Sequence, residues 1–282
     1  MSGSPRTIVV MTGDGPEHRY VANRLCLAVP VAAVVVDTAV RPASIGRAFR
    51  GGVGRGASRV ALHVFRKMVR DRAARAAAAK KVLGTSMTSQ FMYEDRVARV
   101  SGVNSDDAVE LLKGLQPDAI AIYGTTIVRE HVLSQSRDIA FNMHTGISPY
   151  YRGTDCAFWP VVNREPERLG ATVHECTSAV DAGPIFATGR ADWASDDGLH
   201  ELFARTVVKG ADLYVEVLQK YLEGTIQGTE QDLAVGREYR GYMRTLGAEL
   251  RARSALRRGL LRLVEEAPPR IRFFSNRSFR GR

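Results

Sequence analysis

Short apolar runs that suit buried strands alternate along the chain with longer stretches of helical spacing. The first run, Thr7–Met11, and the second, 29–37, flank a stretch at 17–28 with helical composition. Two continuous apolar runs with a helix between them are typical of a βαβ unit in a parallel sheet. Gly13 and Gly15 follow the first run and favour a tight turn, because the third glycine of a dinucleotide-binding loop is missing.

The same alternation continues through the chain and predicts an α/β fold: a Rossmann-like, open, mostly parallel sheet flanked by helices. In such sheets ligands bind beyond the carboxyl ends of the strands, so residues at those ends are the first candidates for a site. Further strands are predicted at 97–103, 119–123, 139–142, 171–176 and 185–190, and helices at 105–115, 128–134, 155–163 and 197–222.

One predicted helix, 59–82, is strongly basic. Apolar residues recur in it at helical spacing between Ala61 and Met68, and basic residues cover the other face. We favour an ordinary amphipathic helix packed on the core, and an interfacial helix on an anionic membrane is the alternative. The Gly- and Arg-rich stretch at 39–58 is predicted to be loop, so 39–85 is interpreted as a basic, partly helical insert.

The formal charge of +10 is concentrated in two segments of the sequence. Residues 41–81 hold twelve Lys/Arg and one acid, and residues 237–282 hold thirteen Arg and four Glu. Such segments attract phosphate from nucleic acid, nucleotide or lipid headgroup, although a solvated face is equally compatible with the charge. We divide the chain into a catalytic domain at 1–225 and an Arg-rich C-terminal extension at 226–282, in which we expect a helix or two and no strands.

The remaining bulk properties exclude several classes of protein. A chain of 282 residues with 45% hydrophobic residues suits a globular domain with a real core, and no apolar run approaches the length of a membrane span. The three cysteines lack metal-like spacing, so we expect neither a disulfide framework nor a bound metal. Since the start of the chain has no export-type apolar segment, we expect a cytoplasmic protein.

The residues that indicate a chemistry lie between 142 and 185. Asn142 and His144 are separated by one residue, so on an extended segment they point to the same side. Gly-Ala-Thr-Val-His follows at 170–174, and Asp-Ala-Gly-Pro-Ile at 181–185. Alone, each polar residue would be a turn former or a satisfied histidine. Together, an amide, an imidazole and a carboxylate suit acyl transfer through an oxyanion intermediate.

These motifs resemble those of the folate-dependent formyltransferase family, which includes glycinamide ribonucleotide, methionyl-tRNA and sugar-nucleotide formyltransferases. The resemblance extends over 117–190 and includes Ser-Pro and Tyr-Arg-Gly within 148–153. It implies 10-formyltetrahydrofolate as donor and a primary amine as acceptor. It also implies that Asn142 and His144 stabilise the oxyanion and that Asp181 assists proton transfer through water.

The resemblance also implies where the folate donor binds. The family packs the pterin against apolar side chains and backbone groups just after the strand at 119–123, so side-chain identity there is permissive. The loop at 177–181 supplies the opposing wall. In this sequence the implied donor-binding residues are Tyr123, Gly124, Ile127, Val128, Thr177 and Val180.

Gly146 and Arg152 are the candidates for contact with the acceptor. Arg152 suits either a bidentate clamp on an acceptor phosphate or an anchor for its own loop, and we leave both open. His174 is expected to be buried and to orient the site loop. Asp155 is expected to cap the helix that follows it, and Trp159 to belong to the core.

The preferred acceptor is a small molecule, an amino sugar attached to a nucleotide, whose diphosphate the basic segments would attract. The segment 145–148 departs from the family pattern close to the acceptor, so the amine itself stays unnamed. A tRNA acceptor is disfavoured because the residues after 225 do not resemble the barrel domain of methionyl-tRNA enzymes. Glycinamide ribonucleotide is disfavoured because its enzymes lack the basic insert.

Two other functions are kept as alternatives. The first is hydrolysis of 10-formyltetrahydrofolate by water, which we disfavour because no regulatory domain resembling the ACT type fits before Thr7. The second is a catalytically lapsed protein that binds folate or a membrane, which the intact set Asn142, His144 and Asp181 disfavours. Peripheral membrane contact through the basic segments and a homodimer are left open.

Overall fold

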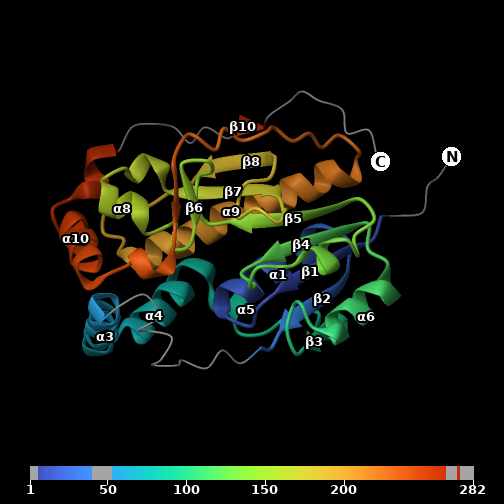
Figure 1. Ribbon diagram of the computed structural model, residues 1–282, viewed down its shortest axis with the longest axis horizontal. Helices are drawn as coiled ribbons and strands as arrows, with labels where there is room; N and C mark the ends of the chain where they lie inside the picture. The colour runs from blue at the N-terminus through green and yellow to red at the C-terminus, as the bar shows by residue number, and fades with distance from the viewer. Residues whose placement is uncertain (1–5, 40–52, 265–271, 274–282) are drawn as a thin grey trace.

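In the computed structural model, which describes residues 6–39, 53–264 and 272–273, an eight-stranded sheet forms the centre of the molecule (Figure 1). Its strands are β1 (Ile8–Thr12), β2 (Val31–Asp37), β3 (Val97–Val100), β4 (Ala119–Tyr123), β5 (Ile139–His144), β7 (Gly170–Glu175), β8 (Ile185–Arg190) and β10 (Arg272–Phe273). The order across the sheet is β10-β8-β7-β5-β4-β1-β2-β3. Five neighbouring strands, β3, β2, β1, β4 and β5, are parallel. Strands β7, β8 and β10 are each antiparallel to their neighbours. The predicted open, mostly parallel sheet is confirmed.

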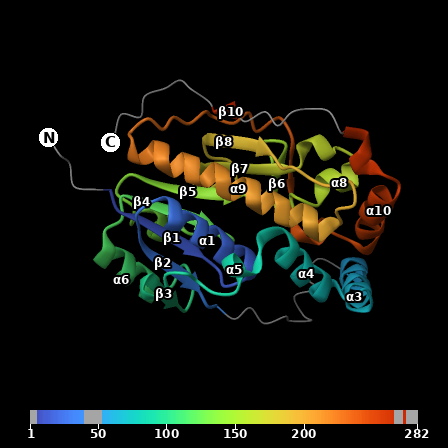
Figure 2. The ribbon, with the colours of Figure 1, turned by 180° about the vertical axis from the view of Figure 1, so that it is seen from behind.

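Helices cover both faces of this sheet and also lie beyond one end of it. The α-helices of the described residues are α1 (Pro16–Ala28), α3 (Val53–Met68), α4 (Asp71–Leu83), α5 (Thr85–Thr88), α6 (Asp106–Leu115), α7 (Glu130–Leu133), α8 (Trp159–Asn163), α9 (Leu199–Leu222) and α10 (Leu246–Arg257). Helices α1 and α9 cover one face (Figure 2), and α6 and α7 pack on the other through a separate apolar cluster. Because both faces are covered, β1 and β4 are buried along their whole length, which explains their continuous apolar sequences.

Helix α9 also ties together the two strands at which the candidate site begins. The Tyr214 side chain is fully buried, and its hydroxyl lies 3.0 Å from the carbonyl oxygen of Phe141 on β5 and 3.3 Å from that of Ile122 on β4. A buried phenol needs such a partner, since an unpaired hydroxyl in the core is costly. This contact fixes the spacing of the two carboxyl ends between which a ligand would enter.

The predicted single helix over 59–82 is wrong: the segment forms two helices, α3 and α4. They meet at an elbow where Arg70 takes a left-handed conformation with φ of 51°. Neither glycine nor proline marks this break in the sequence. Asp71 starts the second helix, where a carboxylate favours a helix N-terminus. The loop predicted at 39–58 lies largely in 40–52, outside the described residues, and the prediction is wrong for residues 53–58, which belong to α3.

The C-terminal extension contains strands that were not expected. Helix α10 confirms the expected helix, but β9 (Arg237–Tyr239) pairs with β6 (Tyr151–Gly153), and β10 joins the main sheet. The Tyr239 ring stacks on Trp159 at 4.6 Å, which confirms the core position of that tryptophan. The division into 1–225 and 226–282 stays a prediction, and the rest of the extension, 265–271 and 274–282, lies outside the described residues.

A buried carboxylate links the basic insert to the extension. Glu249 of α10 is fully buried and accepts hydrogen bonds from Arg244 at 2.9 Å, Arg253 at 3.0 Å and Arg66 of α3 at 3.4 Å. Burial alone would raise the pKa of Glu249, but the three guanidinium groups hold it below its ordinary value.

Within the described ranges, no helix is both long and apolar enough to cross a bilayer.

Candidate active site

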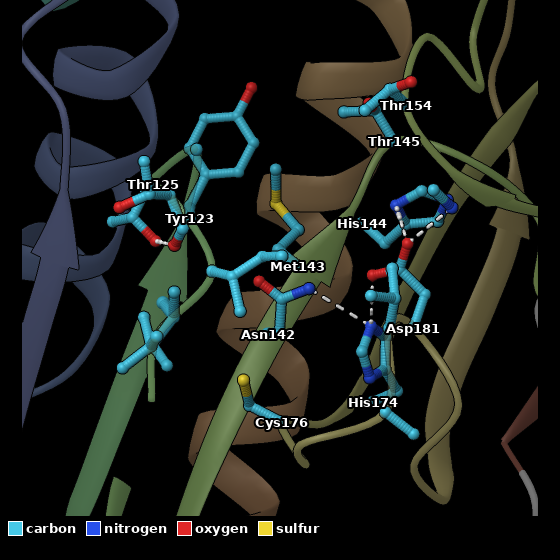
Figure 3. Close-up of a pocket in the computed structure, with 18 of the residues that line it drawn as sticks. Tyr123, Thr125, Asn142, Met143, His144, Thr145, Thr154, His174, Cys176 and Asp181 are labelled. Carbon is cyan, nitrogen blue, oxygen red and sulfur yellow. Dashed lines mark hydrogen bonds and ion pairs between the residues drawn. The ribbon is translucent and has the colours of Figure 1, made fainter. Parts of the chain in front are cut away.

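Asn142 and His144 lie at the carboxyl end of β5, inside a cavity of about 450 Å³ (Figure 3). His144 is the last residue of the strand rather than a residue beyond it, because the antiparallel partner β7 extends the pairing to Thr172. The Thr172 hydroxyl donates to the Gly146 carbonyl at 2.8 Å and accepts from the Ser148 N–H at 3.0 Å. The loop after β5 is therefore held against β7.

Both ring nitrogens of His144 face hydrogen-bond acceptors. Nε2 donates to the carbonyl oxygen of Tyr151 at 2.9 Å, and Nδ1 lies 3.4 Å from Oδ2 of Asp181. The ring is buried, with 7% of the residue exposed. The two acceptors hold the ring in one orientation at the end of β5.

Asp181 lies between two histidines. Its Oδ1 is 3.4 Å from Nε2 of His174, and the backbone N–H of Gly153 donates to Oδ2 at 2.7 Å. Burial alone would raise the pKa of Asp181, but His144, His174 and the Gly153 N–H hold it well below its ordinary value. The residue has φ of 48°, a conformation that Asp and Asn tolerate better than most residues. Asp181 is thus a fixed carboxylate at the cavity wall.

His174 connects Asp181 to Asn142. It lies directly opposite Asn142 in the β5–β7 register and is buried, as predicted. Its Nδ1 donates to the Glu175 carbonyl at 2.7 Å, while Nε2 is 3.1 Å from Nδ2 of Asn142. When His174 is neutral, its Nε2 accepts the N–H of the Asn142 amide. When His174 is charged, Nε2 donates to Asp181, and the Asn142 amide is favoured in the orientation that turns its oxygen toward the ring. The orientation of Asn142 therefore depends on the protonation of His174.

One side of the cavity has an apolar wall around the end of β4. All six residues expected to bind the donor line this cavity, and Ile127 and Val180 face it from the two sides although they are 70% and 41% exposed. Gly124 has φ of 68°, and a Cβ atom there would lie 2.3 Å from Nε2 of His18, so the turn requires glycine. Among the described residues no cluster of three His, Cys, Asp or Glu is placed to hold a metal ion.

The opposite side of the cavity includes a segment that the sequence did not place there. Glu238, Tyr239, Arg240 and Gly241 of the C-terminal extension line the cavity together with Gly153 and Thr154. The pairing of β9 with β6 brings this segment to the site. No local signal indicates such a pairing, because the two strands are far apart in the sequence and only three residues long.

The two residues expected at the acceptor lie outside the lining of this cavity. Arg152 donates through Nη2 to the Leu233 carbonyl at 3.3 Å, which favours the anchoring alternative. Gly146 lies behind the catalytic candidate His144: a Cβ atom would lie 2.5 Å from its Nε2. The expectation that Asp155 caps α8 is wrong, since that helix has no side-chain cap and the carboxylate pairs with Arg244 at 2.6 Å.

Comparison with known proteins identifies the family. Residues 60–218, more than half of the chain, match the family model of formyl transferase. The chain therefore belongs to the formyl transferase family, as the resemblance implied.

Methionyl-tRNA formyltransferases are among the sequence relatives of this chain. Methionyl-tRNA formyltransferases from Chlorobium chlorochromatii and Lactobacillus johnsonii are 32% and 34% identical, over 136 and 137 residues. Each match covers 48% of this chain and only 43% or 42% of the relative, so the chain spans less than half the length of these proteins.

Solved structures share the fold at lower identity. A sugar N-formyltransferase from Shewanella is 13% identical with a TM-score of 0.54, over 89% of this chain and 88% of that chain. Glycinamide ribonucleotide transformylase 1 from Symbiobacterium toebii is 18% identical with a TM-score of 0.51, over 82% and 96%. These likenesses support the Rossmann-like architecture.

Proposed function

We propose that the protein transfers a formyl group from 10-formyltetrahydrofolate to a primary amine of a nucleotide-linked amino sugar. The observation that carries the proposal is the convergence of Asn142, His144 and Asp181 in one cavity with an apolar wall. Donor binding would fall to that wall, with Tyr123, Gly124, Ile127 and Val128 on one side and Thr177 and Val180 on the other.

In the proposed reaction, the amine nitrogen bonds to the formyl carbon and the bond from that carbon to the folate nitrogen breaks. Asn142 and the cation of His144 stabilise the oxyanion that develops on the formyl oxygen. This oxyanion would replace one of the two acceptors that now face the His144 ring. Asp181 accepts the proton that the amine loses, through a water molecule, and the proton returns to the departing folate nitrogen.

The residues on the proposed acceptor side of the cavity favour an acceptor amine that carries phosphate. Arg240 lines the cavity with Thr154 and Gly241, and its guanidinium pairs with Glu238 at 3.0 Å. A guanidinium can bind a diphosphate bidentately. Structural neighbours that include sugar N-formyltransferases agree with this choice of acceptor. The sequence relatives act on methionyl-tRNA according to their names, so that acceptor belongs in the same test.

The test is an acceptor panel with purified protein and a 10-formylfolate donor. The amines are nucleotide-linked amino sugars, glycinamide ribonucleotide and methionyl-tRNA, and one reaction contains no amine. Formylation of an amino sugar, detected by mass spectrometry and abolished in His144→Ala, is the expected result. Turnover without amine would instead identify a hydrolase, and folate binding without turnover would identify a lapsed enzyme. Full activity of His144→Ala would refute the catalytic assignment.

A further inference from the structure

The outward face of α3 is apolar. Val60, Val64 and Met68, which we call the outer stripe, are spaced by four residues and are 47%, 50% and 77% exposed. The opposite side of the helix is the one that contacts the protein, through buried Leu62 and the Arg66–Glu249 ion pair. A surface helix ordinarily turns its apolar stripe toward the core, whereas here the outer stripe faces away from it and is open to an apolar partner.

Exposed cations lie next to the outer stripe. Lys67, Arg70 and Arg72, which we call the elbow cations, line a cavity of about 720 Å³ where α3 meets α4. Over the described ranges none of the three has an ion-pair partner. Asp71, the acid in this cavity, already binds Arg253 at 3.1 Å and His200 at 2.9 Å. The elbow cations are therefore available to an anionic ligand.

We propose that α3 docks the protein on an anionic phospholipid surface. The outer stripe would enter the boundary of the acyl chains, and the elbow cations would lie at the depth of the lipid phosphates, as in other interfacial helices. Each cation near such a surface typically contributes about fivefold to partitioning, so the three together contribute about 100-fold. This inference does not depend on the proposed function.

A membrane explains the face better than a second copy of the chain does. A stable dimer interface buries roughly 20–30 residues on each side, whereas the outer stripe consists of three side chains. Two copies meeting at this face would also bring their elbow cations together, and like charges repel. An anionic lipid surface meets both the apolar and the cationic part of the face.

The docking helix adjoins the catalytic cavity. A cavity of about 270 Å³ is lined by Leu62 and His63 of α3 and by Gly241 and Arg244 of the extension. Gly241 also lines the catalytic cavity. Gly241 therefore lies between the helix that we assign to the membrane and the proposed acceptor side of the catalytic cavity.

The test is vesicle flotation of the full chain at low ionic strength. Vesicles of phosphatidylcholine with phosphatidylglycerol are compared with vesicles of phosphatidylcholine alone. We expect binding to the anionic vesicles only. The double variant Val64→Asp/Met68→Asp should lose binding, and Lys67→Ser/Arg70→Ser/Arg72→Ser should bind about 100-fold more weakly. Leu27→Asp, at a residue of α1 that is 54% exposed, should bind like the unmodified protein.

Circular dichroism tests for misfolding, tryptophan emission tests insertion of the stripe, and size-exclusion chromatography with light scattering tests for a second copy as the partner. Circular dichroism should be the same for all variants, and Met68→Trp should give a blue-shifted tryptophan emission on anionic vesicles. The proposal is overturned if the unmodified protein does not float with anionic vesicles, or if the stripe variant floats equally well. It is also overturned if the stripe variant converts a dimer to a monomer while no form binds vesicles.

Discussion

Replacing Gly146 by alanine tests whether the candidate catalytic histidine is held as tightly as the structure indicates. The added Cβ atom would lie 2.5 Å from His144 Nε2, 2.6 Å from the Cβ of Cys156 and 2.8 Å from the Tyr151 carbonyl oxygen. Ordinary contacts between such atoms are about 3.5 Å, so the ring or the carbonyl must move by roughly 1 Å. The 2.9 Å hydrogen bond between His144 and Tyr151 would then break.

Overpacking of this kind costs about 1–3 kcal/mol, and misplacement of a catalytic group by about 1 Å costs roughly 100-fold in rate. We therefore expect Gly146→Ala to lower Tm by about 2–12 °C and kcat for formyl transfer by about 100-fold. Calorimetry and steady-state kinetics measure the two effects. The matched control is Gly114→Ala in α6, where no atom lies within 4 Å of the added carbon, and it should be neutral or stabilising. An unchanged kcat in Gly146→Ala would refute the reasoning.

Three other predictions concern charge and thiols. Asp181→Asn should lower kcat by about 100-fold or more. Because the pKa of Asp181 is held below its ordinary value, its contribution to stability is present above about pH 4 and lost below it, and the variant should show a flatter acid limb in denaturant titrations at several pH values. Glu249→Gln should destabilise the fold by about 3 kcal/mol, since three arginines lose a buried partner; an unchanged midpoint in urea would contradict this. Burial raises the pKa of Cys176 to about 12 and of Cys26 to about 11, and that of Cys156 well above its usual value, so Ellman's reagent at pH 8 should react slowly with native protein and rapidly with all three thiols in guanidinium.

The sequence predicts the sheet well because the signal for a doubly covered strand is local. The runs at 8–11 and 119–123 are apolar throughout, and both strands lie in the middle of the sheet with helices on each face. The strand that carries Asn142 was also predicted, although it extends to His144 rather than ending at residue 142. The meeting of both residues with Asp181 depends on a turn, and the motif resemblance rather than any periodicity indicated it.

What the sequence missed depends on contacts between distant segments. The break at Arg70 has no glycine or proline, and it is the packing of α3 against α10 that accompanies it. The wall at 238–241 reaches the cavity through a three-residue strand pair, too short for an alternating pattern to reveal. The contact of His174 with Asn142 follows from the β5–β7 register, which an isolated strand sequence does not specify.

The cavity is built from two parts of the chain that are held in place by different sheets. Asn142 and His144 belong to the central sheet, where the Asn142 side chain also contacts His174 of β7. The wall at 238–241 is instead held by the pairing of β9 with β6 and by an aromatic stack outside the main core. Because β9 pairs with β6, which presents the Tyr151 carbonyl to His144 and the Gly153 N–H to Asp181, only substitutions that keep this backbone pairing would reshape the wall without moving the reactive groups.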